Sequence, residues 1–115
     1  MKKIVLSPGG EVLAERAFFA RSLWARLRGL IGRRFASAGF DAMVFENCNA
    51  VHCCWMSEAI DVIFVSRELV VTKVCSGVKP WGIACGGHGT CHTIEIPCGN
   101  AEKYEIKVGG QLEFV

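Results

Sequence analysis

The sequence lacks any hydrophobic run long enough to cross a membrane or to form the core of an export signal. Its first residues, MKKIVLSPGGEV, hold only three consecutive apolar residues. A signal peptide needs a run of about 7–15, and a membrane-spanning helix needs about 20. We therefore expect a protein that is cytoplasmic and has no membrane span.

The sequence also lacks a Cys-x-x-Cys motif, although it has seven cysteines among 115 residues. So many cysteines in a small secreted chain would indicate a disulfide scaffold, but the missing export signal argues against that class. The missing motif argues against a thioredoxin-like redox centre. In a reducing cytoplasm we expect most of the thiols to stay free, and their odd number leaves at least one unpaired.

Repeats, linkers and low-complexity segments are absent as well, so we interpret residues 1–115 as a single domain. A composition of 51% hydrophobic and 21% charged residues excludes a disordered chain. The charge is uneven, because residues 1–40 have eight basic and two acidic side chains and the remainder has five and nine. The arginines are spread out and no aromatic-rich RNA-binding motif accompanies them, so we do not expect nucleic-acid binding.

Most of the chain shows short apolar stretches separated by glycine-rich turns, the pattern of a β-protein. Residues 22–31 differ, because their apolar side chains recur at helical spacing behind Ser22, a good N-cap. Residues 76–90 are expected to form a long glycine-rich connection. These patterns predict a mainly β (α+β) fold, a compact antiparallel β-sandwich or barrel with one N-terminal amphipathic helix. The expected strands are a first hairpin of 3–7 and 11–15, followed by 42–46, 51–56, 59–65, 69–75, 91–96 and 111–115.

Seven short motifs occur in an order that resembles the uncharacterised bacterial and archaeal family called domain of unknown function 192. They include Arg-x-Arg-Gly-Leu at 26–30, Ile-Asp-Val-x-Phe at 60–64 and Glu-x-Pro-x-Gly at 95–99. The resemblance covers the chain from about residue 16. It implies a compact, mostly β domain with one N-terminal helix, and it implies no established activity. His88 and His92 are not part of that pattern, so a family-wide function would not depend on them. The remaining motifs lie at 45–52, 55–56, 79–81 and 106–109.

Residues 47–65, NCNAVHCCWMSEAIDVIFV, concentrate reactive side chains in a stretch that otherwise has the pattern of buried β-structure. On a strand over 51–56, His52, Cys54 and Met56 share one face. They act there as soft metal ligands, or Cys54 and Met56 simply belong to the core, which we favour. Cys48 and His52 can form the nucleophile and base of a small hydrolase only if the chain turns between them. Otherwise the thiol packs and the imidazole hydrogen-bonds within the fold, and we assign no catalytic residue.

A second group of potential ligands lies on the glycine-rich connection. Cys85, His88, Cys91 and His92 are four soft ligands within eight residues, the residue types that bind zinc. Their spacing matches no standard zinc finger, so the alternative is an exposed loop whose thiols cluster by chance. This group supports the hypothesis of a protein that binds zinc or another soft metal, or that responds to thiol redox state.

Two further residues complete the candidate site. Asp61 lies in a strongly apolar strand, either facing solvent or buried with a partner such as His52 or an arginine, and it either supports the fold or lines a site. Trp81 follows Lys79-Pro80 and can floor a pocket, although a packed turn is the simpler interpretation. We favour a non-catalytic domain that binds an unidentified ligand or protein partner through Cys48, His52, Asp61 and Trp81. The metal or redox protein and the Cys/His hydrolase remain the alternatives.

Overall fold

The computed structural model describes residues 2–21, 35, 39–52 and 58–115. Strands dominate this part of the chain because short Val-, Ile- and Phe-rich segments alternate with turns. The elements, in chain order, are β1 (Lys2–Ser7), β2 (Val12–Phe19), β3 (Ala42–Phe45), β4 (Ala50–His52), β5 (Ile60–Val65), β6 (Val71–Val78), β7 (Ile83–Cys85), β8 (His92–Pro97), α3 (Asn100–Lys103) and β9 (Gln111–Phe114).

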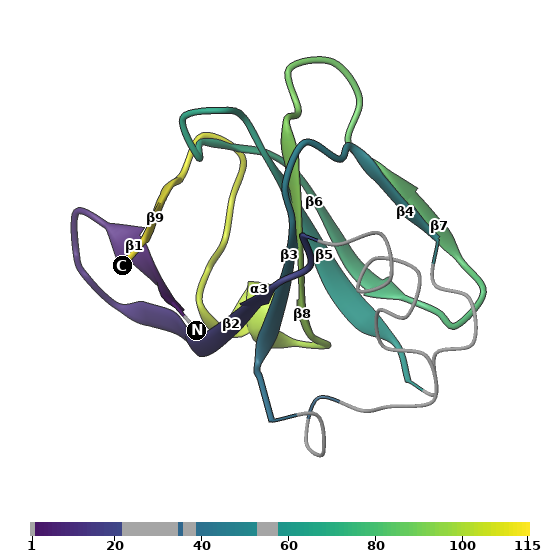
Figure 1. Cartoon of the computed structure of the whole chain (residues 1–115), viewed down its shortest axis with the longest axis horizontal. Coiled ribbons are helices and arrows are strands. Elements are labelled where there is room, and N and C mark those ends of the chain that lie inside the picture. Colours follow the sequence, from purple (N-terminus) through teal and green to yellow (C-terminus); the bar gives the residue numbers. More distant parts are fainter. Residues whose placement is uncertain (1, 22–34, 36–38, 53–57) are drawn as a thin grey trace.

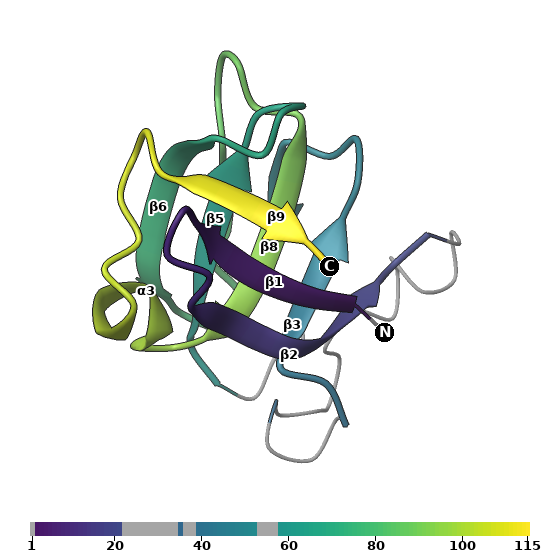
Figure 2. The ribbon, with the colours of Figure 1, turned by 90° about the vertical axis from the view of Figure 1, so that its left-hand side faces the viewer.

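Seven of these strands form one sheet in the order β6-β5-β8-β3-β2-β1-β9, which is strongly curled (Figure 2). The predicted hairpin of β1 and β2 is confirmed. The prediction of an antiparallel sheet is wrong in one place, because β2 and β3 run parallel. A parallel pair needs a long connection, and residues 20–41 supply one. The sheet is therefore mixed.

The curled sheet nearly closes on itself, which makes it a half-barrel and not a sandwich of two large sheets. Its two edge strands, β6 and β9, meet at one corner. There Val70 and Gln111 form an isolated bridge, and the N–H of Leu112 donates to the carbonyl of Leu69 at 2.9 Å. These contacts satisfy backbone groups that the edges of an open sheet would leave unpaired.

Strands β4 and β7 pair antiparallel with each other and form a separate two-stranded sheet, which we call the ribbon. It stands beside β6 (Figure 1). Strand β6 extends to Val78 and β7 falls within residues 76–90, so the prediction of one long connection over that range is wrong. Three residues are too few to show a strand pattern in the sequence, and β7 becomes a strand because β4 lies next to it.

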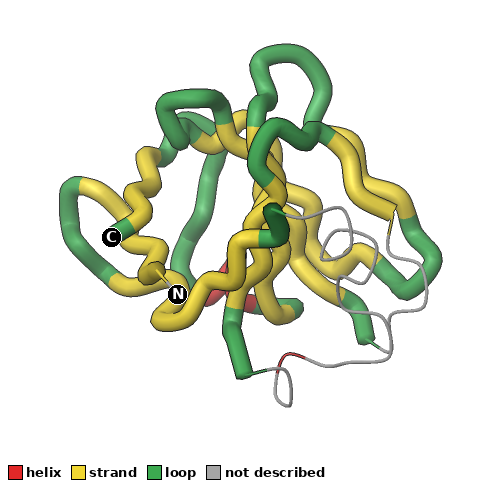
Figure 3. The backbone as a smooth tube through the Cα atoms, viewed as in Figure 1, coloured by secondary structure: helices red, strands yellow, loops and turns green. Residues whose placement is uncertain are grey.

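Helical structure among the described residues includes the short α3 near the C-terminal end (Figure 3). The amphipathic helix predicted for residues 22–31 lies outside the described residues, as do residues 53–56 of the strand predicted over 51–56. No helix in the described part of the chain is long and apolar enough to span a bilayer.

The core has two parts, one on each face of the central strands. Strand β5 contributes to both parts, because its apolar side chains alternate between the two clusters, and all six of its residues, Asp61 included, are buried. The first cluster lines the inside of the curl and includes Ile4, Ala14, Val44, Ile63, Val65, Ile94, Ile96, Ala101 and Leu112. The second cluster covers the outer face and includes Ala20, Phe35, Phe40, Met43, Phe45, Ile60, Val62, Phe64 and Ala84.

Candidate functional site

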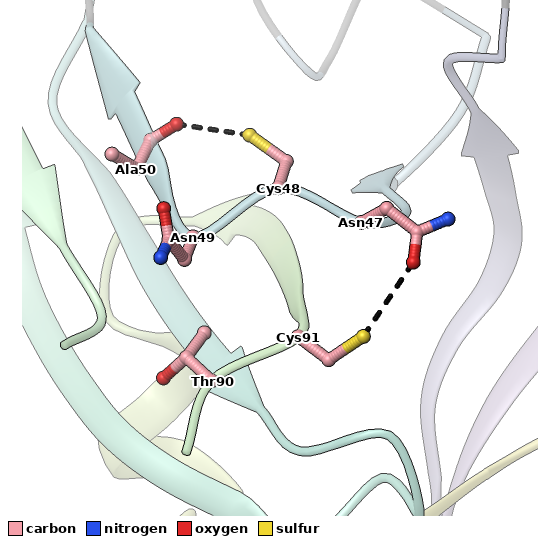
Figure 4. A pocket seen from close by; sticks show the side chains of 6 residues that line it. All are labelled: Asn47, Cys48, Asn49, Ala50, Thr90 and Cys91. Atoms are coloured by element: carbon pink, nitrogen blue, oxygen red, sulfur yellow. Dashed lines mark hydrogen bonds between the residues drawn. The ribbon is translucent and has the colours of Figure 1, made fainter. Parts of the chain in front are cut away.

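Two connections far apart in the sequence meet beside the ribbon and enclose an open depression. One is the link between β3 and β4, and the other is the link between β7 and β8. The N–H of Cys48 donates to the carbonyl of Cys91 at 2.9 Å, and the N–H of Gly86 donates to the carbonyl of Asn49 at 2.7 Å. The depression has a volume of about 430 Å³ and is lined by Asn47, Cys48, Asn49, Ala50, Thr90 and Cys91 (Figure 4).

The turn that forms one wall depends on Asn47. Its φ of 54° lies in the left-handed region, which asparagine tolerates better than most residues. Its N–H donates to Nδ1 of His92 at 3.0 Å. The sequence allowed a turn over residues 47–50; in the structure the turn lies at Glu46 and Asn47, and Ala50 already begins β4. The backbone of Cys48 then lies beside that of Cys91.

Two cysteines from different predicted groups therefore line the same depression. The thiol of Cys48 donates to the carbonyl of Ala50 at 3.0 Å, and the thiol of Cys91 donates to Oδ1 of Asn47 at 3.6 Å. The two sulfur atoms point to different sides (Figure 4). All cysteines in the described part of the chain are free, and this pair is not oriented for a disulfide or a shared metal ion.

His92 supports the wall of the depression through a hydrogen bond to the backbone of Asn47. Because its Nδ1 accepts the N–H of Asn47, the neutral ring carries its proton on Nε2. A ring held in this way is a hydrogen-bonding support for the turn, and its one basic nitrogen is already occupied.

The four predicted metal ligands are spread over several elements. Cys85 is exposed on β7, where its carbonyl accepts Nζ of Lys73 at 2.8 Å. His88 lies in the following turn, and His92 begins β8. Over the described ranges, no three side chains of His, Cys, Asp or Glu are grouped so that they could hold a metal ion. The metal site over Cys85, His88, Cys91 and His92 stays a prediction, and the geometry adds no support to it.

Two further predicted site residues, His52 and Trp81, lie at the end of β4 and in the turn before β7. His52 ends β4 opposite Ile83, and its side chain lies outside the described part, so the predicted pairing with Cys48 is not tested. Trp81 lies in the turn between β6 and β7 with 55% of its surface exposed. Trp81 does not line the depression.

Asp61 is buried, with 1% of its surface exposed. Its Oδ1 accepts the N–H of Gly77 at 2.9 Å. Its Oδ2 accepts the N–H groups of Gly99 at 3.0 Å and Ala101 at 2.9 Å. These contacts tie β5 to β6 and to the start of α3, which supports the fold-stabilising interpretation of Asp61. Its predicted role in ligand binding receives no support from these contacts.

Sequence reasoning missed Glu95. This residue on β8 lies opposite Met43 of β3 and Val62 of β5 and has 4% of its surface exposed. Burial raises the pKa of its carboxyl from 4.5 to about 7. The signal was present, because Glu95 stands between Ile94 and Ile96 just as Asp61 stands between two apolar residues. Strand alternation alone would turn it to solvent, but the second cluster covers that face.

Comparison with known proteins supports the fold. A model of the family DUF192 (Uncharacterized ACR) matches residues 4–114. A crystal structure of a protein of unknown function from Novosphingobium aromaticivorans superposes with a TM-score of 0.77 and 20% identity, covering 96% of this chain and 83% of that one. A "putative transcription regulator" from Sinorhizobium meliloti superposes with a TM-score of 0.81 and 16% identity, covering 98% and 92%. No curated protein matches the chain. At these identities the two structures establish the fold alone.

Proposed function

Because this chain belongs to the uncharacterised DUF192 family, we propose its function from the site itself. The proposed function is non-catalytic binding of a small, neutral, polar molecule in the depression. The supporting observation is the meeting of residues 47–50 with Thr90 and Cys91 around one open volume of about 430 Å³. Ligand sites in proteins commonly have volumes of about 300–1,000 Å³.

The chemistry of the lining favours this class of ligand. None of the six lining residues is charged, and they include two side-chain amides, one hydroxyl and two thiols. Amides both donate and accept hydrogen bonds, so they suit hydroxyl, amide or carbonyl groups. A strongly charged ligand would have no counter-charge among these six residues.

The same contacts make catalysis the weaker proposal. The thiol of Cys48 donates to a backbone carbonyl, and Nδ1 of His92 accepts a backbone N–H. A nucleophilic cysteine needs a base within hydrogen-bond reach of its sulfur, and the described contacts of Cys48 include none. The family name and the regulator name of one structural neighbour do not supply an activity for this chain.

The proposal is tested by amide NMR titration with a panel of neutral probes, namely monosaccharides, polyols, simple amides and nucleosides. We expect shifts centred on residues 47–50, 90 and 91 with at least one class. Asn49→Ala should then weaken binding by about tenfold or more, equivalent to about 1.4 kcal/mol, since it removes an amide from the lining. Asn100→Ala, the same change on α3, should leave binding unchanged. Shifts that centre on another surface, or none with any probe, would contradict the proposal.

A further inference from the structure

The buried carboxyl of Glu95 lies where the seven-stranded sheet and the ribbon share one apolar cluster. Its neighbours across the sheet, Met43 and Val62, both belong to the second cluster. Ala84 of β7 belongs to it too, and Val51 of β4 packs against it. Glu95 therefore faces the apolar side chains of the second cluster, which pack the ribbon against the sheet.

The described surroundings offer this carboxyl no partner. No hydrogen bond or ion pair to Glu95 is present within residues 2–21, 35, 39–52 and 58–115. A buried carboxylate without a partner is expensive. The protonated acid is neutral and fits an apolar cluster much better.

Within the described residues, few other ionisable groups face this cluster. Cys48 and Cys75 pack against it from the β3–β4 link and from β6. Glu58 lies at its rim and accepts the N–H of Phe35 at 2.9 Å. Lys73 lies opposite Phe64 on β6, but its exposed ammonium is bonded to the carbonyl of Cys85. On its own strand, Glu95 shares its face with Thr93, and His92 alternates to the other side.

The cluster is also connected to the depression. Cys48 both lines the depression and packs against the cluster. Its carbonyl accepts the hydroxyl of Thr93 at 2.6 Å, two residues from Glu95 on the same face of β8. The ribbon shares no strand pairing with the large sheet in the described part of the chain, so side-chain packing in this cluster and the bond from Lys73 to Cys85 hold it on the sheet.

We infer that protonation of Glu95 controls how tightly the ribbon packs on the sheet, and thereby controls the shape of the depression. With Glu95 protonated the cluster is neutral and closed. When the proton leaves, the charge draws water towards the second cluster, and the ribbon opens more often. The effect of Glu95 on the ribbon does not depend on the proposed binding function. Its biological significance does rest on that function, because the depression is the proposed binding site.

Amide hydrogen exchange of the unliganded protein at pH 6 and pH 8 tests the inference, after correction for intrinsic exchange rates. If Glu95 has a pKa of about 7 in the closed ribbon and 4.5 once exposed, the open population should rise about tenfold over this range. We expect amides of β4 and β7 to lose protection by that factor. Amides of β1 and β9, which pack on the first cluster, should lose much less.

Glu95→Gln and Glu95→Met remove the titrating group, and either should abolish the loss of protection at β4 and β7. Glu113→Gln, the same change at an exposed site on β9, should behave as the wild type does. An equal loss in the Glu95 variants, a loss spread evenly over all strands, or no loss in the wild type would each overturn the inference. The measurement needs no ligand, so failure of the proposed binding function would appear separately, in the NMR titration.

Discussion

At the scale of single residues, two buried acids in adjacent central strands, Asp61 and Glu95, differ in their hydrogen-bond partners. Asp61 is buried and accepts three backbone N–H groups, which compensate a carboxylate for the loss of water. Glu95 is buried with no described partner, so burial alone raises its pKa to about 7. The difference lies in what each side chain meets. Asp61 meets backbone N–H groups of β6 and of the start of α3, whereas Glu95 lies among neighbours that belong to the second cluster.

The stability of the protein should therefore depend on pH through Glu95. Its folded pKa of about 7 lies above the unfolded value of 4.5, so the folded state binds more protons between these values. Stability due to this group falls as pH rises from about 4.5 to about 7, and is level above that. The shift, 7 − 4.5 = 2.5 units, corresponds to about 3 kcal/mol at 1.36 kcal/mol per unit.

Urea unfolding of the wild type and Glu95→Gln at pH 4, 6 and 8 measures this effect. Relative to its own value at pH 4, the variant should keep about 3 kcal/mol that the wild type loses by pH 8. Glu113→Gln serves as the exposed control and should follow the wild type. Parallel pH curves for wild type and Glu95→Gln would rule out a buried, titrating Glu95.

At the scale of elements, the link between β7 and β8 is held in place by close contacts at both of its ends. The hydroxyls of Thr72 and Thr90 lie 2.7 Å apart. Gly86 lies so close to the sheet that a Cβ there would be 2.6 Å from Cδ1 of Phe64 and 2.6 Å from the side chain of Thr90. The wall of the depression formed by this link is therefore docked on the second cluster, and its glycine is needed for space.

Gly86→Ala should destabilise the protein by about 1–3 kcal/mol, the usual cost of forcing extra volume into a packed region. Gly9→Ala provides the matched control, because nothing lies within 4 Å of a Cβ added there. Thermal unfolding of the two variants beside the wild type gives the comparison. Equal midpoints for Gly86→Ala and Gly9→Ala would show that the link is not packed as described.

At the scale of the whole molecule, the two core clusters use opposite faces of the same two central strands, β3 and β5. If these strands detach from one cluster, the side chains of the other cluster also become exposed to water. We therefore expect the described fold to unfold in one cooperative transition, as most small domains do.

Truncations in the two clusters test this cooperativity. Leu112→Ala in the first cluster and Met43→Ala in the second each remove a side chain that is 1% exposed, and each should cost about 2–5 kcal/mol. Val108→Ala, at 67% exposure, should change stability by less than about 0.5 kcal/mol. Far-ultraviolet circular dichroism and tryptophan fluorescence should give coincident curves for every variant. Separated curves would mean that the clusters unfold independently.

Local pattern and composition were enough to predict the β class and the first hairpin, and the order of seven short motifs carried the resemblance to the family. Period-2 apolar segments and glycine-rich turns act between near neighbours in the chain, so a sequence displays them directly. The same patterns indicated Cys48 and Cys91 as residues of interest, but in two separate groups. Whether either group binds metal or performs chemistry stays a prediction.

Tertiary structure alone decided the features that carry the proposals. The parallel pairing of β2 with β3, the pairing of β7 with β4 and the depression between residues 47–50 and Thr90-Cys91 all join segments that are distant in sequence. Burial of Glu95 is of the same kind, because alternation along β8 describes two faces and cannot tell that both are covered. The sequence determined which segments could be strands; long-range packing determined which faces became core, and so which buried acid gained hydrogen-bond partners.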